Sequence, residues 1–204
     1  MNAERPNNLI EMPLEHYGEL FREADPIALS AKLGVPFEDG CFKLHFLNRE
    51  VHLSHPEMKA VYADTLEETA PKVVILLSRF LLNGEKREST GKMLSYQEVP
   101  WGMTYLTQFK GRCIMRLAFG FGRDAERFKK ACEGVGGVPA KGGDAAYDIA
   151  LLPGLKMRFI LWEGDEEFPP SAQILFSDNF QYAFTAEDMA VCGDLTLDAM
   201  KRVK

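Results

Sequence analysis

Apolar and polar residues alternate along two stretches of the chain, residues 41–53 and 145–162, and each stretch is interrupted by a short turn sequence. The turns are Asn48-Arg49 in the first and Pro153-Gly154 in the second. A period of two places every second side chain on the same face of a strand, and a turn between two such runs is typical of an antiparallel hairpin. The pattern therefore predicts two hairpins, and residues 173–176 read as an additional strand.

Helical spacing of apolar residues, together with residues favoured at helix ends, predicts helices before, between and after these strands. Asp25 and Pro26 are favoured residues at the start of a helix, and Thr185 is a further N-terminal cap. The run from Val73 to Leu82 is apolar almost all round, which predicts a buried core helix. Ser95 and Glu98 have the spacing of a capping box. The expected helices cover residues 14–24, 26–33, 73–82, 104–119, 123–135 and a closing segment after 185.

These elements predict an α+β fold with a single domain over residues 13–204, in which one antiparallel sheet of two hairpins and the added strand packs against several helices. Residues 1–12 are polar and are expected to be a flexible N-terminus. The chain has 204 residues, 46% of them hydrophobic, which is enough for one sizeable core.

Charge and cysteine spacing exclude several classes of function. The 24 basic and 30 acidic residues give a net charge of −6, which opposes nonspecific binding to nucleic acid or anionic lipid. No apolar run has the length of a signal peptide or a membrane helix, so we expect a soluble cytoplasmic protein. The cysteines are scattered and lack zinc or iron–sulfur spacing, so buried free thiols are expected, with a cluster formed only in space as the alternative. They are Cys41, Cys113, Cys132 and Cys192.

The most distinctive segment runs from Trp162 to Phe176, where acidic residues lie between two apolar runs. Four carboxylates fall within residues 163–167 and repel one another, and Pro169-Pro170 restrict the backbone that follows. A stiff, charged segment of this kind indicates a positioned site. Elsewhere, His45 and His52 on the first hairpin, and Tyr105, Arg112 and Arg116 on one helix, are weaker candidates, for a metal and an anion respectively, and are interpreted as structural.

Three interpretations of the acidic segment remain open. In the first, it is a rigid strand connection whose carboxylates accept backbone N–H groups while Phe168 fills the core. In the second, it binds a ligand or partner through apolar contact and oriented carboxylates. The residues of that site are Trp162, Asp165, Glu166, Glu167 and Phe168.

In the third interpretation, the segment serves a carboxylate-metal-dependent enzyme. Asp165 and Glu167 hold Mg²⁺, Mn²⁺ or Ca²⁺, with a further ligand from Asp144 or Asp178, because hard cations prefer oxygen ligands. No nucleophile motif, phosphate loop or calcium-loop spacing accompanies these residues.

The second half of the chain resembles the prokaryotic domain-of-unknown-function family 3786. The resemblance rests on four local motifs between Val73 and the C-terminus. They are Phe80-Leu81-Leu82-Asn83-Gly84, Gly143-Asp144, Leu152-Pro153 and the segment Trp162–Phe176 with its acidic and proline residues. The resemblance implies a protein of anaerobic bacteria or archaea and carries no established activity.

Some members of this family resemble fusions to a cysteine-rich iron–sulfur segment of the kind found in corrinoid proteins, and this chain has no iron–sulfur cysteine motif. The resemblance therefore implies a ligand-binding or accessory module linked to anaerobic redox or one-carbon metabolism, whose partner is a small molecule or a protein of that metabolism. The carboxylate-metal-dependent enzyme and a protein-interaction domain are the alternatives.

Overall fold

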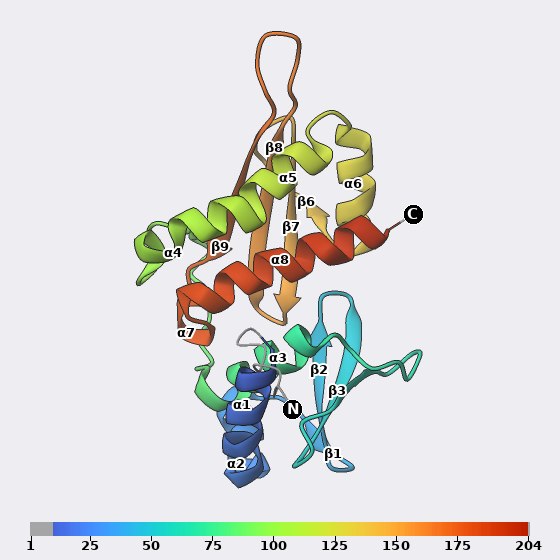
Figure 1. Ribbon diagram of the computed structural model, residues 1–204, viewed down its shortest axis with the longest axis vertical. Coiled ribbons are helices and arrows are strands. Elements are labelled where there is room, and N and C mark those ends of the chain that lie inside the picture. Colours follow the sequence, from blue (N-terminus) through green and yellow to red (C-terminus); the bar gives the residue numbers. More distant parts are fainter. Residues whose placement is uncertain (1–9, 204) are drawn as a thin grey trace, which may run out of the picture. The chain divides into compact units, whose positions relative to one another are not determined.

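The computed structural model describes residues 10–203 of the chain, and these form two compact units (Figure 1). The first unit contains residues 10–44 and Arg49–Lys86, and the second contains His45–Asn48 and residues 87–203. Each unit combines helices with an antiparallel sheet, which confirms the predicted α+β class. Residues 1–9 of the predicted flexible N-terminus lie outside the described residues, and Glu11 and Met12 already belong to the first helix.

The first unit contains three helices and a sheet with the strand order β1-β2-β3-β4 among the residues described. Its elements are α1 (Glu11–Glu23), α2 (Pro26–Leu33), β1 (Phe37–Glu38), β2 (Cys41–Phe46, whose last two residues are counted with the second unit), β3 (Arg49–Ser54), β4 (Ala60–Tyr62) and α3 (Pro71–Asn83). Strands β2 and β3 are the predicted first hairpin, and β1 and β4 extend it on both sides.

Local signals in this unit act as the sequence predicted. Asp25 accepts a hydrogen bond from the Ile27 amide (2.9 Å) at the start of α2, and Gly34 ends that helix with φ 67°, which glycine adopts without strain. Helix α3 is buried on nearly all sides, with Leu77 and Leu81 fully enclosed. The polar face of the hairpin carries His52, whose ring contacts Glu50 (2.6 Å) and Lys43 (3.4 Å).

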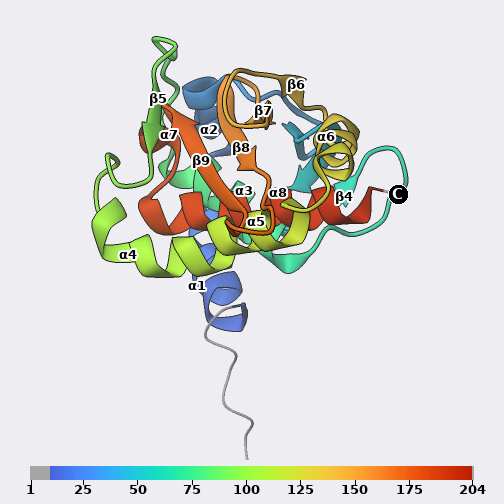
Figure 2. The ribbon, with the colours of Figure 1, turned by 90° about the horizontal axis from the view of Figure 1, so that it is seen from above.

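The second unit contains a sheet with the order β5-β9-β8-β7-β6 and a set of helices (Figures 1 and 2). Its strands are β5 (Met93–Ser95), β6 (Val138–Pro139), β7 (Ala145–Leu152), β8 (Leu155–Trp162) and β9 (Ser171–Ser177). Its helices are α4 (Gly102–Phe109), the π-helical segment η1 (Lys110–Ile114), α5 (Met115–Phe121), α6 (Ala125–Gly134), α7 (Phe180–Ala183) and α8 (Ala186–Arg202). Segments η1 and α5 pack on β9, and α8 packs beside α4 and η1.

The two predicted hairpins lie in different sheets, whereas the sequence pattern had placed them in one. The alternation of apolar and polar residues identifies which residues form strands. It does not identify which strands pair, because the edge of any strand offers the same N–H and C=O groups. In the second sheet, β8 pairs with β7 and with β9, as Phe159 opposite Tyr147 and Ile174 shows. Residues 173–176 are therefore the predicted third strand, within β9.

Helix α4 begins after the Ser95–Glu98 pair, two residues before the predicted helix start at residue 104. Glu98 does accept hydrogen bonds from the Ser95 amide (2.7 Å) and hydroxyl (2.9 Å), but the pair closes a turn after β5 and no helix begins there. The helix begins at Gly102, where an added Cβ would lie 1.8 Å from the Tyr96 carbonyl oxygen. Only glycine fits this position. At the start of α8, the predicted N-terminal cap Thr185 is present and forms a capping box with Asp188.

Helices α4, η1 and α5 form one continuous rod with a π-helical centre. Its buried residues recur every fourth position, and each is at most 2% exposed: Phe109, Cys113, Leu117 and Phe121. In an α-helix of 3.6 residues per turn, a four-residue spacing drifts by about 40° at each step. The wider turn of a π-helix offsets part of this drift, so the spacing explains why η1 forms here.

Candidate functional site

The acidic segment is the connection between β8 and β9, residues 163–170, at the end of the second sheet (Figure 1). Trp162 ends β8 opposite Ser171, the first residue of β9. Pro169 and Pro170 precede β9 directly, so the loop enters the strand with a restricted backbone. The sheet therefore sets both ends of the loop.

Asp165 closes the loop on itself. Its Oδ1 atom accepts hydrogen bonds from the backbone amides of Phe168 (2.7 Å) and Glu167 (2.8 Å), and its own amide donates to the Phe168 carbonyl (2.9 Å). These amide donors stabilise the ionised carboxylate, so they hold the pKa of Asp165 below its ordinary value. An aspartate that folds back onto the next amides is a recognised turn former. This carboxylate is therefore part of the loop's own structure.

The base of the loop is tied to its surroundings by Glu163 and Gly164. The Glu163 amide donates to Asp144 Oδ2 (2.8 Å), and its Oε1 accepts from the Ala125 amide (3.0 Å) at the start of α6. An anionic group is favourable at a helix N-terminus, where amides lack partners. The Gly164 amide donates to the Gly122 carbonyl (2.9 Å), and an added Cβ would lie 2.5 Å from Pro170. Contacts with α5 and α6 thus hold the base in place.

The tip of the loop, defined here as Glu166, Glu167 and Phe168, is exposed. No side-chain hydrogen bond or ion pair of Glu166 or Glu167 is found among residues 10–203. Phe168 is 67% exposed, so the expectation that it fills the core is wrong. The reason is the Asp165 turn, which fixes the backbone at Phe168 in a loop with no core behind it. Trp162 is 38% exposed.

The residues predicted to bind a ligand thus fall into two groups. Trp162, at the end of β8, and Asp165, in the turn, belong to the base of the loop, whereas Glu166, Glu167 and Phe168 form its exposed tip. Below the tip lies an open surface depression of about 640 Å³. Its lining residues are Arg123, Glu163, Gly164, Asp165 and Glu166.

The predicted metal ligands are not gathered into a set. Asp144 binds the Glu163 amide at the loop base, while Asp178 accepts hydrogen bonds from Ser89 (2.6 Å) and Thr90 on another loop. Those hydroxyl groups lower the pKa of Asp178. Within residues 10–203, no group of three or more histidine, cysteine, aspartate or glutamate side chains is arranged to hold a metal ion.

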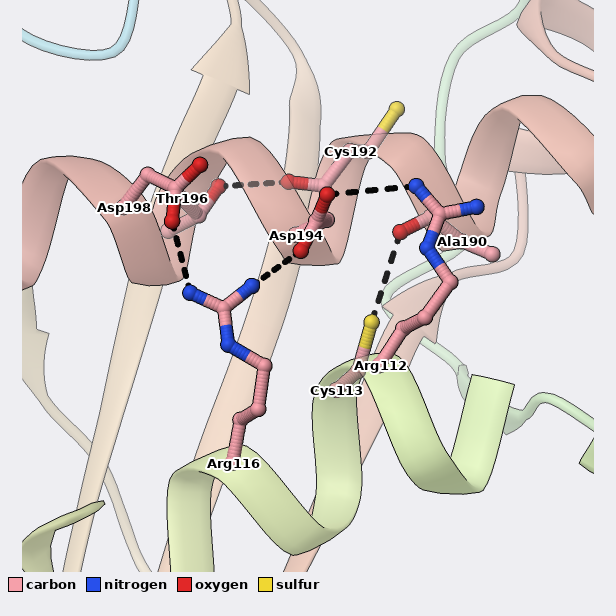
Figure 3. Close-up of polar contacts among 8 residues, drawn as sticks. All are labelled: Arg112, Cys113, Arg116, Ala190, Cys192, Asp194, Thr196 and Asp198. Atoms are coloured by element: carbon pink, nitrogen blue, oxygen red, sulfur yellow. Dashed lines mark hydrogen bonds and ion pairs between the residues drawn. The ribbon is translucent and has the colours of Figure 1, made fainter. Parts of the chain in front are cut away.

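A second polar cluster links η1 and α5 to α8 (Figure 3). Asp194 is bound by Arg112 (3.1 Å) and by Arg116, and Arg116 also binds Asp198 (2.6 Å). The Asp194 side chain is only 8% exposed. Burial opposes the charge of Arg116, but the hydrogen bond to Asp198 and the nearby Asp194 outweigh it and raise the pKa of Arg116.

This cluster explains what Arg112 and Arg116 do, and it confirms that they are structural. Asp194 and Asp198 are four residues apart on one helix, so they lie on the same face of α8. The four-residue spacing of these two aspartates is visible in the sequence, but it does not identify the arginines that they bind. Beside it, the Cys113 thiol donates to the Ala190 carbonyl (3.3 Å), and burial raises the pKa of Cys113 to about 12. Cys113 is therefore a buried thiol and not a nucleophile.

None of the helices within residues 10–203 is both long enough and apolar enough to cross a membrane. Among curated proteins and among solved structures, no match to the chain was found. The sequence does match a protein family, described as Domain of unknown function (DUF3786), over residues 25–199. That match covers most of the chain and includes the β8–β9 loop, the Arg–Asp cluster and both sheets. The chain therefore belongs to the DUF3786 family.

Proposed function

We propose that this chain is a non-enzymatic accessory module that binds a partner protein through the tip of the β8–β9 loop. One observation carries the proposal: Phe168 is 67% exposed at a position where the Asp165 turn fixes the backbone. A large aromatic side chain gains free energy when it is removed from water. A fixed turn that keeps such a side chain in solvent is typical of a contact residue.

The rigidity of the loop lowers the cost of binding. Association orders side chains and loops, and a surface that is already ordered loses less conformational entropy. The Asp165 turn, the Glu163 contact with α6 and the Gly164 contact with Gly122 all order the loop in advance. Phe168 is then the apolar anchor, and the exposed carboxylates orient the partner.

The tip also indicates the chemistry of its partner. Glu166 and Glu167 directly precede Phe168 and add negative charge to the tip, and the whole chain carries a net charge of −6. A complementary surface has an apolar pocket bordered by lysine or arginine side chains. We place this partner among the soluble proteins of anaerobic redox or one-carbon metabolism in a prokaryotic cytoplasm.

The geometry gives less support to the two other interpretations. Asp165 and Glu163 already accept backbone amides, which leaves them fewer lone pairs for a metal ion. Small-molecule sites are concave and bury most of their ligand, whereas the depression below the tip is open and largely charged. A surface of this shape is better suited to a protein.

The test is a quantitative co-purification from the source organism with the tagged wild-type chain, followed by binding measurements on the purified partner. Phe168→Ala is the first variant and the pair Glu166→Gln and Glu167→Gln is the second. Glu19→Gln, an exposed carboxylate on α1, is the matched control. We expect the wild type and the control to enrich the same protein. In calorimetry, both tip variants are expected to bind this protein at least tenfold more weakly than the wild type does. Equal affinity of all four chains would refute the proposal.

A further inference from the structure

A line of exposed residues runs along the rod formed by α4, η1 and α5. Its members are four residues apart: Met103, Thr107, Gly111, Met115 and Phe119. The three large ones are 65%, 53% and 66% exposed, for Met103, Met115 and Phe119 respectively. We name this line the exposed helix stripe. Apolar residues in a row on one face, rather than scattered singly, mark an interaction surface.

The π-helical segment keeps the stripe on one face. The same four-residue spacing governs the buried line through Phe109 and Leu117, and η1 offsets part of the drift of both lines. A regular α-helix would turn the stripe around the rod over this length. One face of the rod thus packs on the rest of the second unit. A separate face presents apolar residues to solvent.

The stripe is complementary to a second copy of itself. Gly111 lies at its centre, and an added Cβ there would meet no atom within 4 Å. If two rods pack antiparallel about a two-fold axis at Gly111, Met115 of each copy faces Thr107 of the other, and Phe119 faces Met103. Each large side chain thus meets a different position, and glycine at the crossing point allows the two backbones to approach closely.

The charges at the two ends of the rod are also complementary. The base of the acidic loop is bound to Gly122, just after α5, so Glu166 and Glu167 lie toward the C-terminal end. Helix α4 begins with neither an acidic residue in its first turn nor a side-chain cap, and the carboxylate that precedes it, Glu98, is paired with Lys92 (3.9 Å), so the positive end of the helix dipole remains available at this end of the rod. Gly102 and Gly122 lie about 14 and 16 Å from Gly111 along the rod, at about 1.5 Å per residue. An antiparallel pair therefore places each acidic tip near the start of the other copy's α4.

We propose that the chain forms a two-fold dimer through the exposed helix stripe, and that the second copy completes the binding surface at the loop tip. Trp101, 77% exposed at the start of α4, and Met103 of one copy lie beside Glu166, Glu167 and Phe168 of the other. The composite surface rests on the proposed function of the tip. The dimer itself rests on the stripe.

The first test is the mass in solution, measured by sedimentation equilibrium between about 1 and 100 µM. The wild type is expected at twice the monomer mass of 23.0 kDa. Gly111→Gln is expected at the monomer mass with an unchanged far-UV circular dichroism spectrum, because glutamine favours a helix, its Cβ meets no atom within 4 Å in its own chain, and its side chain blocks the close approach. Lys130→Gln, on the exposed face of α6, is the control and stays dimeric. A wild-type monomer at 100 µM, or a dimeric Gly111→Gln chain, overturns the dimer.

The second test does not depend on whether the Gly111→Gln chain folds normally. Residue 111 lies at the two-fold axis, so Gly111→Cys is expected to form a disulfide with its own counterpart within minutes of mild oxidation. A disulfide needs Cα atoms about 4.4–6.8 Å apart, which only the crossing point provides. Lys130→Cys is the matched control and remains uncrosslinked. Equal crosslinking of the two variants overturns the proposed axis.

The two proposals fail in distinguishable ways. If the wild type is a dimer and Gly111→Gln binds the partner protein as tightly as the wild type, the tip works alone and the composite surface is wrong. If Phe168→Ala binds the partner normally while the dimer persists, the proposed function of the tip is wrong and the dimer stands. Loss of partner binding in both Gly111→Gln and Phe168→Ala supports the composite surface.

Discussion

Gly193 of α8 lies directly against the thiol of Cys113 in η1: a Cβ added to Gly193 would sit 2.9 Å from the Cys113 sulfur. Glycine is ordinarily unfavourable in the middle of a helix, by about 1 kcal/mol relative to alanine. Here it allows the two helices to approach. Cys113 has no room to retreat, because it is fully buried and bound to the Ala190 carbonyl.

We therefore expect Gly193→Ala to lower the free energy of unfolding by about 1–3 kcal/mol, the usual range for overpacking, despite the gain in helix propensity. Cys113→Ala on its own leaves a small cavity, and the double variant recovers part of the loss from Gly193→Ala. A double-mutant cycle by urea unfolding measures this coupling. Additive effects of the two changes would show that the contact is not the cause.

Asp194 is expected to matter more for stability than Asp198. The Asp194 side chain is 8% exposed and is shared by two arginines, whereas that of Asp198 is 40% exposed and contacts one. Breaking a buried ion pair leaves an uncompensated charge, so Asp194→Ala is expected to cost about 2–4 kcal/mol, and Asp198→Ala about 1 kcal/mol or less. Urea denaturation of both variants checks the order. Equal losses would contradict it.

The Asp165 turn is expected to weaken in acid. Backbone amides of Phe168 and Glu167 lower the pKa of Asp165 in the folded chain relative to its ordinary value of 3.8. The folded chain therefore binds this proton less readily than the unfolded chain. The turn's contribution to stability is present above about pH 4 and is lost as pH falls through the lower, folded pKa.

A carbon-detected NMR titration of the Asp165 carboxyl group checks this directly, with an expected midpoint below 3.8. The amide resonances of Glu167 and Phe168 should move with the same midpoint. Asp165→Asn removes that shared transition. A midpoint at or above the ordinary value would mean that the turn does not hold the carboxylate in solution.

Cys41 is expected to be the first cysteine to react with an alkylating reagent. It is partly exposed in β2, whereas Cys113, Cys132 and Cys192 are buried. Burial also raises the pKa of Cys113 to about 12 and that of Cys132 above its ordinary value, so both stay protonated at pH 8. Peptide mapping after brief treatment with iodoacetamide measures the order. Early labelling of Cys113 would show that the contact between η1 and α8 opens readily.

Local signals explain the parts of the fold that the sequence predicts well. Asp25 with Pro26, and Thr185 with Asp188, each act within one helical turn, so the helix starts follow from neighbouring residues alone. The β7–β8 hairpin is similarly local, since its turn joins consecutive strands. The buried face of α3 follows from its nearly continuous apolar run.

Features that depend on distant residues were not predictable in the same way. The pairing of Arg116 with Asp194 joins positions 78 residues apart, and each helix alone gives no sign of which helix it will contact. The exposure of Phe168 depends on which distant segments pack behind the loop, and no core lies there. Hydrophobicity alone favours burial, which is why the sequence interpretation of that residue failed. The separation of the two hairpins into two sheets likewise depends on strand pairing between segments that are far apart in the sequence.

The π-helical segment η1 contains, in effect, one residue more than a regular helix needs between Phe109 and Leu117. A deletion of one residue within residues 110–112 would convert the spacing of the buried line from four, four and four to three, four and four, which an ordinary α-helix accommodates on one face. Most single deletions in a helix rotate everything that follows by about 100°. At this point we expect the chain to tolerate the loss of one residue while Leu117 and Phe121 keep their places in the core, whereas a deletion in α5 would move Phe121 out of it.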